Sequence, residues 1–211
     1  MFNFQQHFYQ GLTLHESEFL QLPGIEDSNL AHFSRKFKKS SFKDVVQKPQ
    51  CRKRLLEYFG EDSKTLRQVE LALECIPNNQ LSMRSFVKIT EEEFQEEIFQ
   101  GDIFTVEFTL KRLNKRNGFI HSKAFPFLKK ESLNVLVFYK NPRQVVHFEK
   151  IIIGDREDKK QGVVDGVFQR KIEFSSYAQF MGVMEFELFV ISDSYIGLDE
   201  CVEFEVKVGE K

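Results

Sequence analysis

The sequence predicts an α+β chain in which a small helical bundle precedes an immunoglobulin-like (fibronectin type III-like) β-sandwich. Apolar residues recur at helical spacing up to Pro77, and beyond it they alternate with polar residues. The 211-residue chain is 41% apolar and 29% charged, a balance typical of folded domains. Its 24 phenylalanines, with no tryptophan, indicate a core built largely from Phe rings.

Two helices are predicted before residue 40. Phe4, Phe8 and Leu12 recur every fourth residue and place one apolar stripe on an opening helix over residues 3–12. A proline–glycine pair at 23–24 then interrupts the pattern. We expect the second helix to begin with Asp27 or Ser28 as its N-cap, because both side chains can accept a hydrogen bond from the first turn.

Three further short helices are predicted before Pro77. Ser41 and Asp44 match a capping box. Pro49 suits the first turn of the next helix, which Gly60 ends. A polar residue at 62–63 caps the last helix. Helices this short must pack on each other, because none is long enough to persist alone.

After Pro77 the period changes to two, which is typical of half-buried strands. Segments rich in turn residues, such as 154–162, separate the alternating runs. Short strands without helices between them favour a two-sheet sandwich. The predicted strands lie near residues 81–89, 102–111, 132–140, 145–153, 166–174, 183–191 and 201–208.

Charge and cysteine content narrow the class of protein. A net charge of −2 excludes a globally basic nucleic-acid binder but leaves room for a local basic patch. The three cysteines, an odd number at wide spacing, argue for a reducing compartment and against a disulfide scaffold. No apolar run approaches the length of a transmembrane helix.

Signatures of catalysis are missing from the sequence. It contains no phosphate-binding glycine loop, no Gly-X-Ser-X-Gly elbow and no His-Glu-X-X-His pair, and its five histidines are scattered. We therefore expect a non-enzyme with no catalytic residue, no cofactor, no metal site and no small-molecule substrate.

One charge feature suggests a binding surface. Nine basic residues and one acid, Asp44, lie between residues 35 and 54. They form either the solvated side of helices whose other side is apolar, or a patch for an acidic protein, RNA phosphate or anionic lipid. Our candidate partner-binding residues are Arg35, Lys36, Lys38 and Lys39. The other basic residues are Lys43, Lys48, Arg52, Lys53 and Arg54.

Several stretches, taken in order, resemble a known family. Ser192–Asp199, with the sequence SDSYIGLD, is followed by an alternating strand and resembles the end of the domain named for Sec sixty-three. The resemblance covers about residues 4–208. It departs at 133–135, where the family has paired tryptophans. The other matching stretches are 18–23, 31–33, 52–56, 76–78, 101–112 and 124–131.

That resemblance implies an organisation and a role. It implies a remnant of an upstream helical bundle over 1–24, a small helical domain over 25–78 and a fibronectin-type sandwich over 79–211. The family includes the J-domain translocation subunit of the endoplasmic reticulum membrane. Its cytosolic part contacts the protein-conducting channel and other translocon subunits and supports post-translational import.

The same domain follows the cassettes of spliceosomal Ski-like RNA helicases, where it would bind RNA or protein partners. Leu198 favours the translocation subunit, because the helicases usually carry cysteine there. On that interpretation the chain faces the cytosol, does not itself span the membrane and binds no nucleic acid. We interpret the polar residues of SDSYIGLD as structural: Asp193, Ser194, Tyr195, Gly197 and Asp199.

Overall fold

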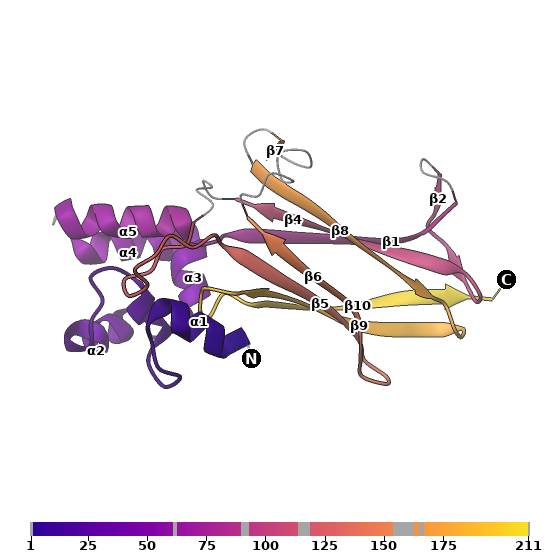
Figure 1. Cartoon of the computed structure of the whole chain (residues 1–211), viewed down its shortest axis with the longest axis horizontal. Helices are drawn as coiled ribbons and strands as arrows, with labels where there is room; N and C mark the ends of the chain where they lie inside the picture. Colours follow the sequence, from indigo (N-terminus) through magenta and orange to yellow (C-terminus); the bar gives the residue numbers. More distant parts are fainter. Residues whose placement is uncertain are drawn as a thin grey trace.

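The computed structural model describes residues 2–60, 63–89, 93–113, 119–153, 163–164 and 167–210. Helices occupy the first part of the chain and strands the rest, as the change of hydrophobic period predicts (Figure 1). The helices gather at one end of an elongated sandwich of two sheets (Figure 1). The predicted fold class, a helical unit followed by an immunoglobulin-like sandwich, is confirmed.

The helical unit begins with α1 (Phe2–Gln10) and the 3-10 helix η1 (Glu18–Gln21). It continues with α2 (Asp27–Lys36), α3 (Phe42–Gln47), α4 (Pro49–Phe59) and α5 (Ser63–Cys75). The capping box at α3 is confirmed, since Ser41 Oγ accepts from the Asp44 N–H and Asp44 Oδ2 from the Ser41 N–H, both at 3.1 Å. Pro49 occupies the first turn of α4, and Gly60 ends it with φ of 62°.

The predicted N-cap of α2 is wrong by one residue. Glu26 is the cap, and Asp27 already belongs to the helix. The cause is Asn29, whose side-chain oxygen accepts from the Glu26 N–H at 3.0 Å and so fixes the start of the helix one residue earlier. Residue 62 lies outside the described residues, so the cap of α5 stays a prediction. The predicted turn segment 154–162 also lies outside them.

Two sheets form the sandwich, antiparallel throughout except for the parallel pairing of β3 with β10, and every predicted strand is present. One sheet, sheet A, has the order β2-β1-β4-β8-β7, and the other, sheet B, has the order β3-β10-β9-β5-β6. The short strands β2, β3 and β7 carry too few residues to show a period, so the sequence missed them. The strands are β1 (Asn79–Lys88), β2 (Phe94–Gln95), β3 (Ile98–Phe99), β4 (Ile103–Arg112), β5 (Ser132–Tyr139), β6 (Gln144–Ile152), β7 (Val163–Val164), β8 (Val167–Tyr177), β9 (Gly182–Ser192) and β10 (Glu200–Gly209).

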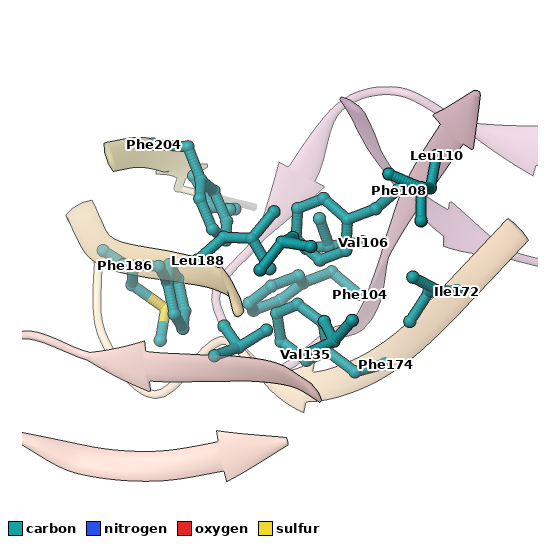
Figure 2. Packing of buried hydrophobic residues seen from close by; sticks show 14 of the residues in the cluster. Phe104, Val106, Phe108, Leu110, Val135, Ile172, Phe174, Phe186, Leu188 and Phe204 are labelled. Carbon is teal, nitrogen blue, oxygen red and sulfur yellow. The ribbon is translucent and has the colours of Figure 1, made fainter. Parts of the chain in front are cut away.

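Phenylalanine fills the space between the sheets, as the composition predicts. The Phe186 ring stacks on Phe204 with centroids 5.1 Å apart, and the Phe108 ring meets the edge of Phe204 at 5.5 Å (Figure 2). Phe108 also stacks on Phe174 across neighbouring strands of sheet A. These contacts join the inner faces of both sheets into one core.

A second core lies inside the helical unit, and it includes two residues of the sandwich. Tyr195 and Leu198, from the turn between β9 and β10, are buried among the helices. The apolar side predicted for the basic helices is also confirmed as core. Its buried residues are Phe33, Phe37, Phe42, Val46 and Leu55.

Of the apolar stripe predicted on the opening helix, Leu12 packs against this core, but Phe4 and Phe8 do not face it. Phe4 and Phe8 are 69% and 63% exposed, whereas Gln6 and Gln10 on the opposite side of α1 are almost fully buried. The reason is that α1 packs on backbone carbonyls of the β9–β10 turn, which need hydrogen-bond donors that a phenylalanine cannot supply. No described helix is long and apolar enough to cross a membrane.

Candidate partner-binding site

The four candidate residues Arg35, Lys36, Lys38 and Lys39 form one exposed surface, here called the basic surface. Arg35 and Lys36 lie in the last turn of α2, and the two lysines follow in the connection to α3. Positive charge is favourable at this position, because the carbonyl groups at the end of a helix give it partial negative charge. That these four residues bind a partner stays a prediction.

Ion pairs engage three of the nine basic residues; Arg52 and Arg54, like the four residues of the basic surface, have no carboxylate partner among the described residues. The basic surface therefore remains available to an external anion. The paired residues are Lys43 with Glu200 at 3.0 Å, Lys48 with Asp44 at 2.7 Å and Lys53 with Glu57 at 3.9 Å.

Contacts from α4 order one edge of the basic surface. Arg54 Nη2 donates to the backbone oxygen of Lys36 at 2.6 Å, and its guanidinium lies 5.2 Å above the Phe37 ring. The Lys36 ammonium lies 5.3 Å from the centre of the Tyr58 ring. The Arg54 hydrogen bond holds the backbone of Lys36, and the contact with Tyr58 holds its charge, which reduces the entropy lost on binding a partner.

The residues of the SDSYIGLD turn lie elsewhere, at the junction between the sandwich and the helices. Asp193 is buried beside the start of β5, where its carboxylate accepts from the Ser132 N–H at 3.3 Å and from Lys129 Nζ at 2.6 Å. The hydroxyls of Ser132 and Ser194 also donate to it. Asp193 therefore joins the β9–β10 turn to β5, which agrees with the structural role expected for it.

Tyr195 inserts into the helical core, with 1% of its surface exposed. Its hydroxyl accepts from the His121 N–H at 2.8 Å, so the expected partner for a buried tyrosine hydroxyl is present. Burial raises the pKa of Tyr195 well above its ordinary value. The side chain is thus a neutral anchor.

Gly197 adopts φ of 78°, which confirms the expected positive φ. A Cβ at this position would also collide with the Glu18 carboxylate. The Glu18 carboxylate itself accepts a hydrogen bond at 2.8 Å from the N–H of Phe42, which is the first residue of α3. The glycine therefore lets the turn, η1 and α3 meet at one point.

Sequence reasoning missed three buried glutamines that hold this turn. Each carboxamide reaches backbone groups of residues far away in the sequence. The signal was present in α1, where two glutamines are spaced by four residues opposite the phenylalanines. The bonds run from Gln6 Nε2 to Ser192 O at 2.7 Å, from Gln10 Nε2 to Ser194 O at 2.7 Å, and from Gln21 Nε2 to Ile196 O at 3.0 Å, with Ile196 N donating back to Gln21 Oε1 at 2.9 Å.

A buried ion pair, also missed, reinforces the junction. The guanidinium of Arg112, at the end of β4, pairs with Glu131, just before β5. Arg112 also donates to the backbone oxygen of Cys75 at 2.5 Å, at the end of α5. Burial raises the pKa of Glu131, and the charge of Arg112 opposes that shift. The pair joins both sheets to the last helix.

The comparisons with known proteins identify no family for this chain. No family model matches the chain, and no curated protein matches it. Among solved structures it is similar to the CARDB domain of the PF1109 protein from Pyrococcus furiosus, described in complex with di-metal ions. That similarity has a TM-score of 0.41 and 11% identity, and it covers 65% of this chain and 97% of that one. A similarity this distant says nothing about what the chain binds.

We predict that Tyr195 stabilises the whole chain. Tyr195→Phe leaves the His121 N–H without its acceptor and should cost about 1–3 kcal/mol of unfolding free energy. Tyr195→Ala also opens a cavity and should cost about 3–5 kcal/mol. Urea denaturation measures both, with the exposed Tyr177→Phe as control. A Tyr195→Ala variant as stable as the parent would contradict this role.

Asp199 should make stability depend on pH. Its carboxylate accepts from Gln6 Nε2 at 2.8 Å and from the Ser192 N–H at 3.1 Å, and burial raises its pKa. Because the folded pKa is the higher one, the contribution of Asp199 to stability is full below about pH 4 and falls as pH rises through the raised value.

Asp199→Asn keeps the side-chain oxygen that both donors reach but cannot ionise. Urea denaturation between acidic and neutral pH should therefore show the parent losing stability relative to Asp199→Asn as pH rises. A stability difference that stays constant across this range would show that ionisation of Asp199 is not coupled to folding.

Proposed function

We propose that the chain is a non-catalytic protein-interaction module. Following the resemblance to the Sec sixty-three domain, we propose further that it is a cytosolic part of an endoplasmic reticulum translocation protein. There it contacts the protein-conducting channel complex and supports post-translational import. The observation that carries the proposal is the basic surface: four exposed cations without carboxylate partners in the described chain, on a helical unit fixed to a sandwich.

The junction supports this proposal by making the basic surface part of a stiff body. The turn between β9 and β10 is buried in the helical core, and α1 and η1 bond to its backbone. A partner that contacts the helices therefore meets a preformed surface, and little conformational entropy is lost on binding. The charge favours an acidic segment of the partner.

RNA phosphate is the alternative ligand, and it corresponds to an accessory domain of a spliceosomal RNA helicase. The basic surface and the neighbouring Tyr58 ring, over which Lys36 lies, resemble the cation and aromatic pairs that bind single-stranded RNA. Four cations are few for a groove that follows the phosphates of a nucleic acid. We therefore favour the acidic protein partner.

Charge reversal tests the proposal. Lys38→Glu with Lys39→Glu should lower capture of the solubilised channel complex by the tagged chain about tenfold at low salt. The matched control is Lys88→Glu with Lys111→Glu, two exposed lysines of sheet A, which changes the net charge equally. The control should capture as the parent does.

Two results would contradict the proposal. One is capture of the channel complex that is unchanged by reversal of Lys38 and Lys39. The other is tight binding of single-stranded RNA that these reversals abolish and that weakens steeply with salt, which would favour the helicase alternative.

A further inference from the structure

The outer face of sheet B carries an apolar row that crosses four strands. In the register, Phe148 of β6 lies opposite Leu136 of β5, Leu136 opposite Phe189 of β9, and Phe189 opposite Cys201 of β10. Phe138, with Val145 beside it, extends the row toward the far end of the sandwich. The outer face of an antiparallel sandwich is ordinarily polar, because water covers it.

This apolar row is exposed to solvent. Phe148 is 55% exposed and Val145 is 48% exposed, and the neighbouring Leu136, Phe138 and Phe189 are half-buried. Figure 1 shows the helices gathered at one end of the sandwich, beside the ends of its strands. The helical unit therefore leaves this face uncovered.

Four glutamates adjoin the apolar row in an arrangement that costs stability. Glu187 lies directly opposite Glu203, and Glu185 directly opposite Glu205. Side chains in such cross-strand pairs are about 5 Å apart at Cβ, where like charges repel. The ion pairs from the turn between β5 and β6 reach only the first of these two glutamate pairs. Lys140 Nζ donates to Glu203 at 2.8 Å, and Arg143 Nη2 lies 3.0 Å from Glu187 Oε2 in an ion pair.

Sheet A also has a pair of glutamates directly opposite each other, but there cations neutralise it. There Glu107 lies opposite Glu173. Arg84 bonds Glu107 through two nitrogens, at 3.0 and 3.1 Å, and Lys171 bonds it at 3.2 Å. Among the described residues, two cations pair with the opposed carboxylates of sheet A, both at Glu107, whereas two cations serve the four carboxylates of sheet B.

Glu185 and Glu205 are left facing each other without an ion-pair partner in the described part of the chain. The local negative charge is evident at Lys140, whose pKa is raised by its bond to Glu203, with further contributions from Glu185 and Glu187. A lysine or arginine from outside would fit between the two free carboxylates, while an apolar side chain beside it covered the exposed row.

We propose that the outer face of sheet B is a docking surface for a basic segment of a partner protein. The segment places apolar side chains on the row that includes Phe148 and Phe138, and a cation between Glu185 and Glu205. This surface is separate from the basic surface on α2 and has the opposite charge. Its test therefore stands or fails independently of the proposed contact with the channel.

A peptide with a leucine-rich half and a lysine-rich half is a direct probe. Fluorescence anisotropy should show that the labelled peptide binds the chain and that Glu185→Gln with Glu205→Gln weakens binding about tenfold. The same double change should raise the midpoint of thermal unfolding, because it removes the repulsion. Phe148→Ser should also weaken binding.

Matched controls lie on sheet A. Glu173→Gln removes a carboxylate from the opposed pair that already has cations, and Ile103→Ser removes an exposed apolar side chain. Both should bind the peptide as the parent does. Peptides with glutamate in place of lysine, or serine in place of leucine, should bind weakly.

Three results would overturn the proposal. The first is equal binding by the parent and the Glu185→Gln/Glu205→Gln variant. The second is an equal loss of binding in Glu173→Gln. The third comes from analytical ultracentrifugation: a dimer of the parent that the double variant abolishes would identify a second copy of the chain as the occupant in place of a basic partner.

Discussion

The burial of one turn of the sandwich inside the helical unit determines how the molecule is organised. The turn after β9 places Tyr195 and Leu198 in the helical core, and Asp193 ties the same turn to the start of β5. Buried glutamines satisfy its carbonyl groups, which would otherwise cost about 1–3 kcal/mol each. Because the same turn is tied to both the helical unit and the sandwich, neither of them can move far without disrupting the packing of the other.

Because the shared turn joins the helical unit to the sandwich, it also fixes the two charged surfaces relative to each other. The basic surface on α2 and the acidic, apolar face of sheet B belong to parts joined by buried contacts, so each presents its charges in a fixed arrangement. The two surfaces have opposite charge and lie on different elements, so they would engage chemically different partners. A rigid scaffold with separate binding faces suits a role in assembly, which the proposed place in a translocation complex requires.

The positions of helices and strands could be predicted from hydrophobic periodicity. The orientation of α1 and the buried ion pair could not, because they depend on contacts between residues far apart in the sequence. Alternation of Phe104 and Val106 with polar residues was enough to place β4, and both side chains are buried. The opening helix was also predicted, but its phenylalanines do not face the core, because Gln6 bonds a backbone oxygen 186 positions away. The Arg112–Glu131 pair was missed for the same reason, since a charged residue at a strand end ordinarily faces water. The basic residues were located by composition alone, but only the structure separates the paired from the unpaired ones.

Hydrogen exchange measured by mass spectrometry across a urea series tests most directly whether the shared turn makes the two parts one unit. The account predicts that amides of α3 and α4 lose protection at the same urea concentration as those of β9 and β10, because one set of buried contacts stabilises both. Loss of protection in the helices at clearly lower urea, with the sandwich still protected, would contradict it.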